Sequence, residues 1–369
     1  MSAVATRPSL AATGEQDELR STVRQFLSAT SGPAAVRRVM ETKEGFDLAT
    51  WRQMAEQVGL QALLVPERYE GLGQGAVEAH VVFEEMGRAL YPGPYFASAA
   101  FAVYALLCSR DEAACRDLLP GIAAGSTIAT VAVAGDGVRA SRDRGGWKVS
   151  GSKSFVPNGH VANLLLVTAR TDAGLSLFAV DAAAPGVEAR ALQSLDLTRR
   201  LAGLDLKGAS ARLVGADGGA PGVVAETVDR ALVALAAEEA GGAARCLEMS
   251  VEYAKQREQF GRPIGSFQAI AHRCVEMLQR VEFARAASRY AASCLAGETT
   301  EFPVAAQVAA AYCGRAYRWV ATENIQIHGG IGFTWEHDAH LHYRRGWANE
   351  ALFGGADKHH LKIAERLGL

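Results

Sequence analysis

The spacing of apolar residues changes twice along this chain of 369 residues, and that change constrains the fold more than any other feature. The first third has the spacing of amphipathic helices. Short β-favouring runs begin near Gly125, and helical spacing returns at about Val223 and continues to Leu369. Consecutive blocks of helices and strands favour α+β layers over alternating βαβ units. We therefore expect a helical domain over residues 1–122, an antiparallel β-domain over residues 123–222 and a second helical domain over residues 223–369.

Local signals place the elements within these blocks. Thr13 followed by Gln16 fits a capping box, and Thr50 followed by Gln53 repeats the pattern, with Gly59 as a stop. A further helix is predicted over residues 77–90. The β-favouring runs, which alternate with Gly, Asp and Asn clusters, are residues 127–133, 147–156, 164–168, 175–180 and 196–214.

Composition excludes several classes of function. A net charge of −2 gives no electrostatic field that would concentrate nucleic acid or anionic lipid. No apolar run approaches the roughly 18 residues that span a bilayer, and the first thirteen residues lack a signal-peptide pattern. The six cysteines show neither C-x-x-C nor metal-ligand spacing with histidine. We expect reduced thiols, no metal site and a cytoplasmic location.

Two blocks roughly seventy residues apart carry residues suited to a large dinucleotide. In the first block, Arg257 precedes Phe260 and a chain break, a setting in which a guanidinium can grip a pyrophosphate. Gln268 and Gln326 carry amides that both donate and accept. The glycine cluster after Gln326 does not fit a nicotinamide fingerprint, because the segment before it is helical rather than a strand. The glycine cluster fits a turn whose backbone a phosphate or sugar can approach closely. This interpretation accounts for the cluster better than a tight turn that only connects two packed helices.

Taken together, the blocks resemble the acyl-CoA dehydrogenase family. The first matches its Arg-x-x-Phe-Gly and Phe-Gln signature, and the second matches its Gln-x-x-Gly-Gly-x-Gly-Phe turn. Weaker family patterns match residues 65–73, 84–88 and 151–159. The similarity covers nearly the whole chain in the same order.

The resemblance implies a helical N-terminal domain, a central β-domain and a C-terminal four-helix bundle. It also implies FAD held across a subunit interface in a tetramer that is a dimer of dimers. By the same resemblance, three sets of residues are expected to contact the cofactor. Arg257, Phe260 and Gln268 would contact the flavin of a neighbouring subunit. The adenylate side would lie against Gln326, Gly329 and Gly330, and the isoalloxazine would lie near Phe155 and Val156.

The reaction of such sites is α,β-desaturation of an acyl-CoA thioester. A carboxylate removes the α-proton while the β-hydrogen leaves as hydride to the flavin. Donors on the thioester carbonyl make the α-carbon acidic enough for a glutamate to act as the base. The family also implies an electron-transfer flavoprotein as the electron acceptor.

This chain departs from the family where the base should be. Phe353 stands in place of the usual glutamate, and Ala231 stands at the position that a subset of the family uses instead. The family loop that packs on flavin and thioester is replaced by residues 132–137. Pro157 replaces a threonine that faces the flavin and has neither a hydroxyl nor an N–H.

Three other acids are candidates for a relocated base. Glu238 lies seven residues after Ala231, on nearly the same helical face but ~10 Å along the axis. Glu350 lies about one turn before Phe353, and Glu239 points about 100° away from Glu238. Of these we select Glu238 as the candidate catalytic residue, although each acid could equally be an ordinary salt-bridged or solvated side chain.

Three hypotheses for the function remain open. In the first, the chain pairs with a homologous dehydrogenase subunit that supplies the base, while this chain completes the FAD clamp. In the second, the chain is a self-sufficient homomeric dehydrogenase with a relocated glutamate. In the third, it is an inactive scaffold that keeps the fold without turnover.

Overall fold

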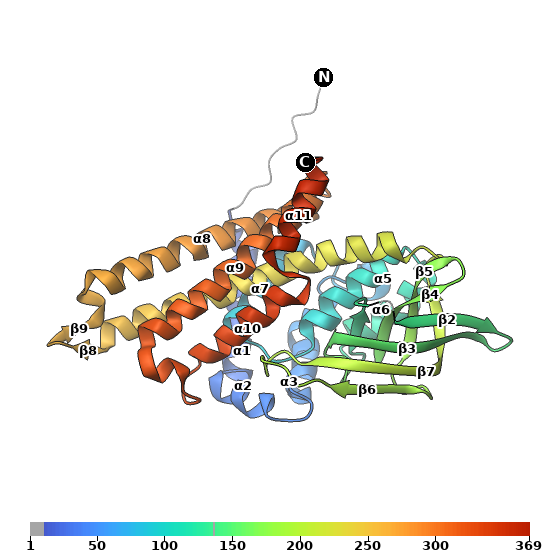
Figure 1. The fold of residues 1–369 in the computed structure, drawn as a ribbon, viewed down its shortest axis with the longest axis horizontal. Coiled ribbons are helices and arrows are strands. Elements are labelled where there is room, and N and C mark those ends of the chain that lie inside the picture. The colour runs from blue at the N-terminus through green and yellow to red at the C-terminus, as the bar shows by residue number, and fades with distance from the viewer. Residues whose placement is uncertain (1–10, 136) are drawn as a thin grey trace, which may run out of the picture. The chain divides into compact units, whose positions relative to one another are not determined.

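The computed structural model describes residues 11–135 and 137–369, which form two compact units (Figure 1). Unit 1 contains the described residues up to Pro33 together with Ala76–Tyr91 and Leu232–Leu369. Unit 2 contains Ala34–Gly75 and Pro92–Ala231. The order of helices, then strands, then helices along the chain confirms the predicted α+β class.

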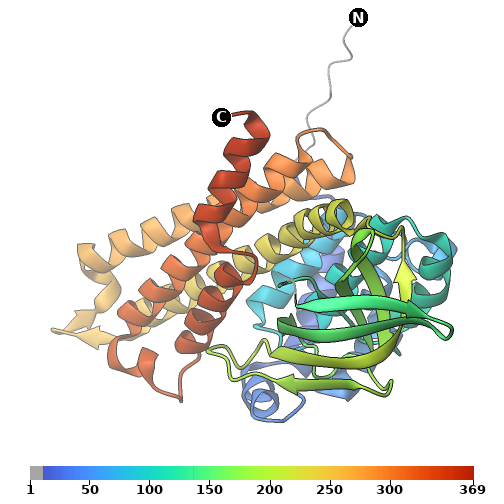
Figure 2. The ribbon, with the colours of Figure 1, turned by 45° about the vertical axis from the view of Figure 1, so that its right-hand side comes forward.

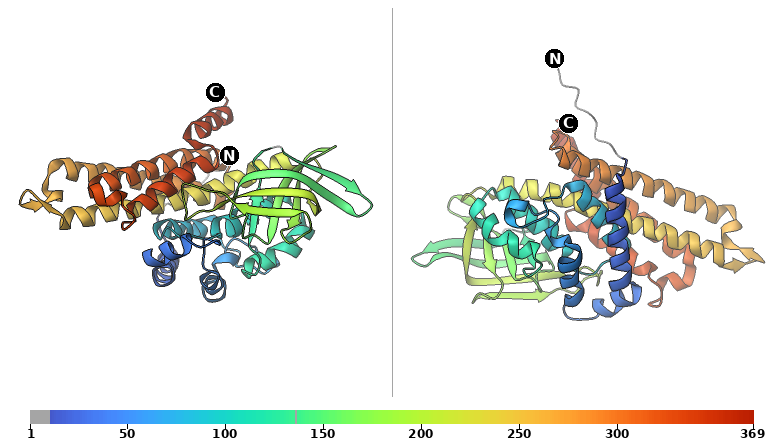
Figure 3. Two further views of the ribbon diagram at one scale, coloured as in Figure 1. Left: turned by 60° about the horizontal axis from the view of Figure 1, so that its bottom comes forward. Right: turned by 180° about the vertical axis from the view of Figure 1, so that it is seen from behind.

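Unit 1 is helical. Its long helices lie alongside one another as a bundle, and the short hairpin β8–β9 joins the end of α7 to the start of α8 (Figure 3). Its elements are α1 (Gly14–Thr30), α4 (Ala76–Arg88), the greater part of α7 (Ala220–Gln256), β8 (Glu258–Gln259), β9 (Arg262–Pro263), η5 (Ile264–Ser266), α8 (Gln268–Ala296), α9 (Phe302–His328), η6 (Gly329–Phe333), α10 (Ala339–Leu352) and α11 (Gly355–Leu367).

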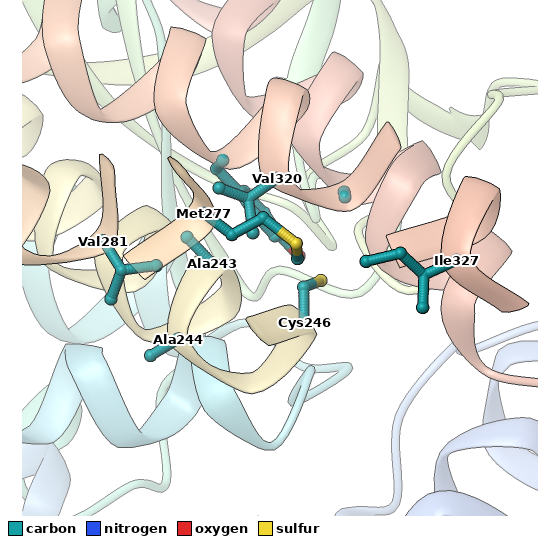
Figure 4. Packing of buried hydrophobic residues seen from close by; sticks show 9 residues of the cluster. Ala243, Ala244, Cys246, Met277, Val281, Val320 and Ile327 are labelled. Carbon is teal, nitrogen blue, oxygen red and sulfur yellow. The ribbon is translucent and has the colours of Figure 1, made fainter. Parts of the chain in front are cut away.

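Small side chains let the helices of this bundle pack closely. Ala243 and Cys246 of α7 meet Met277 of α8 and Val320 of α9 in a buried cluster (Figure 4). Each of these four side chains is fully buried. Burial of a side chain the size of Met277 contributes roughly 1.5–3 kcal/mol.

Two glycines bring α4 and α7 into backbone contact. A Cβ added to Gly87 would lie 1.9 Å from the carbonyl oxygen of Glu238, and one added to Gly241 would lie 1.8 Å from that of Glu84. Any side chain at either position would therefore overlap the facing helix. This contact holds the backbone of α7 around Glu238 against α4.

Two buried glutamates of α4 form ion pairs with partly exposed arginines of α1 and α8. Arg20 lies 2.7 Å from the carboxylate of Glu84, which also accepts from Nε of Arg285 at 3.0 Å. Arg24 pairs with Glu85 at 2.7 Å. Both glutamates are buried, and each has two guanidinium partners that compensate its charge.

Unit 2 combines short helices with a seven-stranded sheet (Figure 2). Its helical elements are α2 (Pro33–Met40), α3 (Leu48–Gln53), η1 (Met54–Val58), η2 (Leu60–Ala62), η3 (Glu67–Tyr69), η4 (Phe96–Ala102), α5 (Val103–Ser109) and α6 (Glu112–Ala123). Its strands are β1 (Ala129–Ala132), β2 (Val138–Asp143), β3 (Gly146–Pro157), β4 (Leu164–Thr171), β5 (Gly174–Asp181), β6 (Val187–Ala191) and β7 (Leu201–Val214).

The sheet is mainly antiparallel, as predicted, with the order β1-β4-β2-β3-β7-β5 and β6 paired to β7. Two pairings differ from the prediction, because β1 and, at a single residue pair, β2 each run parallel to β4. The intervening chain therefore crosses over rather than turning back as a hairpin. The longest pairing, β3 with β7, contains a register shift between Lys153 and Val156.

The local predictions have mixed outcomes. The capping box of Thr13 and Gln16 is confirmed, and Gly59 ends η1 in a left-handed conformation with φ of 73°. The cap predicted at Thr50 is wrong, because Asp47 caps this helix by accepting from the amide of Ala49 at 2.9 Å. Thr50 instead lies within α3.

All six cysteines are free thiols, and five of them are buried. Over residues 11–135 and 137–369, no helix is long and apolar enough to cross a bilayer. The same ranges contain no group of three or more His, Cys, Asp or Glu side chains placed to hold a metal ion.

Candidate cofactor and active site

The first sequence block forms a projecting arm at the end of α7. Strands β8 and β9 pair through a turn in which Phe260 and Gly261 both have positive φ, 55° and 76°. Phe260 is 92% exposed, and its ring meets Phe267 edge-on at 6.0 Å. Arg262 lies over the other ring, 4.2 Å from the centroid of Phe267. The arm therefore presents an aromatic tip that its own contacts hold in place.

Arg257 and Gln268 stand exposed at the base of this arm. The backbone of Arg257 is fixed from both sides, since its amide donates to Tyr253 and its carbonyl accepts from Ile264, each at 2.8 Å. Gln268 begins the 29-residue helix α8, and no side chain caps that helix start. An open helix start next to a guanidinium favours an anionic ligand such as a pyrophosphate.

The second block lies at the end of α9. Gly329 ends that helix with φ of 64°, and a Cβ added at Gly329 or Gly330 would meet nothing within 4 Å. The backbone is therefore open to close approach by a ligand. Gln326, one turn earlier, is exposed.

A stack of rings joins the two blocks. Tyr253 of α7 stacks on His328 of α9 with centroids 4.4 Å apart, and the ring of His337 lies 4.3 Å from that of His328 with the two planes tilted by 45°. Nδ1 of His328 is 2.7 Å from the carbonyl of Asn324, which fixes the ring. The structure thus brings together Tyr253 and His328, which are 75 positions apart in the sequence. This ring contact was not predicted from the sequence, although Tyr253, four positions before Arg257, was a visible signal.

In unit 2, the register shift in β3 turns Phe155 outward. Phe155 has φ of 59° and is 65% exposed, whereas Val156 is buried in the sheet core. A large side chain held in the left-handed region is strained, and such residues cluster at functional sites. Of the two predicted isoalloxazine contacts, only Phe155 presents its side chain to solvent.

The backbone that follows Phe155 offers few hydrogen-bonding groups to a flavin. Pro157 has no N–H, and its carbonyl already accepts from the hydroxyl of Thr130 at 2.5 Å. The buried ammonium of Lys153 donates to the carbonyl of Gly135 and to the hydroxyl of Thr168, the latter at 2.9 Å. These bonds anchor the segment after β1 to the sheet.

Neither family position for the base carries an acid. Ala231 is fully buried in α7, and Phe353 caps the end of α10 with its side chain partly buried. Neither side chain can accept a proton. Any base in this chain must come from another position.

Glu238, the predicted base, lies in a buried ion pair. Its Oε1 accepts from Arg345 at 2.7 Å and from Asn349 at 3.1 Å, and Arg345 also donates to the carbonyl of Tyr91 at 3.3 Å. Glu238 is 3% exposed. Its role as a base stays a prediction, and proton abstraction would require this ion pair to open.

The other two acids are also enclosed. Glu239 is buried, and Glu350 lies 2.9 Å from Arg318 with its side chain 13% exposed. Both line a small cavity together with Phe353. The carboxylates of Glu239 and Glu350, which lie near Phe353, therefore face the interior of unit 1.

With this geometry established, comparison with known proteins identifies the class. The chain matches the N-terminal, middle and C-terminal domains of acyl-CoA dehydrogenase over residues 13–126, 123–200 and 222–368. It belongs to the acyl-CoA dehydrogenase family, whose members are flavin oxidoreductases that act on the CH–CH bonds of acyl-CoA.

Particular relatives narrow the comparison. The chain is 35% identical to acyl-CoA dehydrogenase IpdE2 of Mycobacterium tuberculosis over 92% of each chain. It is similar to the ChsE4–ChsE5 complex from the same organism, at 29% identity and a TM-score of 0.88, over 98% of this chain and 99% of the other. A variant of the Tcur3481–Tcur3483 steroid ACAD gives 31% identity and a TM-score of 0.85, over 96% and 98%.

Proposed function

We propose that this chain is one subunit of a heteromeric acyl-CoA dehydrogenase, in which it completes the FAD clamp while a homologous subunit supplies the catalytic base. The observation that carries the proposal is a contrast within the chain. The residues that would reach a neighbour's cofactor are exposed, whereas Ala231 and Phe353 replace the base and Glu238 is held by Arg345.

The residues of unit 1 fit FAD from a neighbouring subunit. Arg257 and the start of α8 would hold the pyrophosphate, and Gln268 would add amide donors. The open backbone at Gly329 and Gly330 would receive the adenylate side, and Phe260 would cover an aromatic face. When bound, FAD supplies the redox chemistry of α,β-desaturation.

The residues of unit 2 are less well suited to hold a second flavin, one bound by this chain itself. Pro157 offers no hydrogen bond to a flavin edge, and Val156 is buried. Phe155 remains available only as an apolar surface. We therefore expect one FAD for each pair of unlike subunits rather than one for each chain.

Two features of the relatives support an unequal pair and suggest a first substrate. The ChsE4–ChsE5 complex and the Tcur3481–Tcur3483 protein each carry two subunit names. The second is described as a steroid ACAD, so a steroid-derived acyl-CoA is the first substrate to test. We expect electrons to leave through an electron-transfer flavoprotein, as the family resemblance implies.

The test is to purify the chain alone and together with its nearest genomic homologue that carries an intact glutamate. Flavin absorbance, turnover and a flavin content of one FAD per unlike pair, appearing only in the co-purified complex, are the expected results. Flavin and turnover in the isolated chain would instead establish a homomeric enzyme and return attention to Glu238 and Glu350. Absence of flavin and turnover in every pairing would favour an inactive scaffold.

A further inference from the structure

A small cavity lies inside unit 1, below the end of α10. Its volume is about 10 Å³, and it is lined by side chains of α7, α9, α10 and α11. A polar cavity of roughly 10–15 Å³ or more can hold one water molecule. The polar lining comes from Glu239, Asn349, Glu350 and His359.

Two buried oxygens of this lining have no hydrogen-bond donor. They are Oδ1 of Asn349 and Oε2 of Glu350. Asn349 is 1% exposed, and its Nδ2 already donates to Glu238 at 3.1 Å. Exchange of its amide atoms would turn an oxygen toward that carboxylate, so the orientation of Asn349 is fixed chemically. Arg318 lies 2.9 Å from Oε2 of Glu350 as an ion-pair partner but outside hydrogen-bond geometry.

We propose that one ordered water molecule occupies this cavity and donates one hydrogen to Oδ1 of Asn349 and the other to Oε2 of Glu350. Buried polar atoms in folded proteins nearly always have a partner, and water is the group of the right size that supplies two donors. The described residues hold no cluster suited to a metal ion. His359 does not replace the water as a donor through Nδ1, which lies 2.7 Å from Oε1 of Gln307.

The water completes a polar chain through the bundle. The chain runs from the carbonyl of Tyr91 through Arg345, Glu238 and Asn349 to the water, and then to Glu350, which pairs with Arg318. The water thereby connects the buried ion pair of α7 and α10 to α9. The site is independent of the proposed dehydrogenase role, because it concerns the packing of unit 1 alone.

The experiment is a set of crystal structures, at a resolution that shows ordered water, of the wild-type chain in its purified form and of two variants. The wild type is expected to show one density peak within hydrogen-bond distance of Asn349 Oδ1 and Glu350 Oε2. Glu350→Met keeps the side-chain length and removes one acceptor, so the peak should disappear. Arg318→Met removes the ion-pair partner of the same carboxylate but leaves both acceptors, so the peak should remain.

An empty cavity, a cation, or direct contact between the two side chains in the wild type would overturn the proposal. So would a peak that survives in Glu350→Met and disappears in Arg318→Met. Thermal unfolding of both variants shows whether each still folds. If Glu350→Met does not fold, the wild-type density alone decides the outcome.

Discussion

Glu238 and Arg345 form an ion pair of 2.7 Å in which neither side chain is more than 5% exposed. One partner comes from the middle of α7 and the other from α10, and Asn349 adds a bond to the same oxygen. The acid that the sequence selects as a relocated base thus holds two helices of unit 1 together. The distinction between the two roles can be measured.

Glu238→Gln should destabilise the chain without abolishing turnover in the heteromeric complex. Removal of one partner of a buried pair leaves the other charge uncompensated, at a cost of about 3–5 kcal/mol. Stability is measured by denaturant unfolding, and turnover is measured per bound flavin. Glu282→Gln, at an exposed carboxylate of α8, is the control. A fall in turnover of two or more orders of magnitude, with the fold retained, would instead identify Glu238 as the base.

Phe353→Glu should not restore activity to the isolated chain. Phe353 lines the same cavity as Glu239 and Glu350, so a new carboxylate would meet like charges. We expect a loss of about 2 kcal/mol relative to Phe353→Gln, shrinking as the pH is lowered and carboxylates become protonated. Unfolding of both variants and an acyl-CoA turnover assay check this. Turnover by Phe353→Glu alone would show that only the base was missing.

Arg257→Gln should weaken flavin binding in the complex. The substitution removes a charged fork of donors, which is worth about 1.5–3 kcal/mol, or roughly 10- to 150-fold in the dissociation constant of FAD. Titration of the apo complex with FAD measures the effect. Arg116→Gln, at an exposed arginine of α6, should leave the affinity unchanged. Equal affinity in both variants would remove Arg257 from the clamp.

Gly241→Ala should disrupt the contact between α4 and α7. Its Cβ would lie 1.8 Å from the carbonyl oxygen of Glu84, and the helices must separate to admit it. We expect a loss of about 3 kcal/mol in the free energy of unfolding. Gly222→Ala on the same helix meets nothing within 4 Å, so it should be neutral or stabilising by less than about 1 kcal/mol. Similar stabilities for the two variants would contradict the close contact.

Stability should fall in acid partly because of His342. Burial, reinforced by the positive charges of Arg245, Arg345 and Arg88, lowers the pKa of His342 to about 3. The unfolded chain therefore binds a proton that the folded chain does not. This contribution is fully present above about pH 6.5 and is lost as the pH falls toward 3.

Between pH 8 and pH 5 the loss from His342 amounts to about 2 kcal/mol. Denaturant unfolding at the two pH values should therefore show a smaller difference for His342→Gln than for the wild type. His360→Gln, at an exposed histidine of α11, should retain the wild-type difference. An unchanged difference in His342→Gln would show that other groups account for the acid sensitivity.

Local chemistry made much of the fold predictable. Helical spacing, the break near Gly125 and the cap at Thr13 each depend on residues that are neighbours in sequence. Strand β2 was missed because its residues from Arg139 to Asp143 are mostly exposed and polar, which leaves no apolar alternation to detect. The cap at Thr50 was misplaced because Asp47, an equally good capping residue, lies three positions earlier.

The environment of the candidate site could not be predicted in the same way. Whether Glu238 faces substrate or a guanidinium depends on Arg345, which is 107 positions away in sequence. The contacts of Gly87 and Gly241 likewise arise only when α4 meets α7. The residues of the proposed FAD clamp were easier to select, because their types and spacing match the family signature regardless of packing.

In the proposed heteromer, the arm around Phe260 has a consequence for the choice of partner. Its turn, its edge-on ring contact and the guanidinium of Arg262 over Phe267 all lie within a dozen residues of one chain. The arm can therefore adopt its conformation before a second subunit binds. Association then carries no entropic cost for ordering the arm. Such preorganisation discriminates among related subunits, since a rigid projection rejects a surface to which a flexible one would adapt.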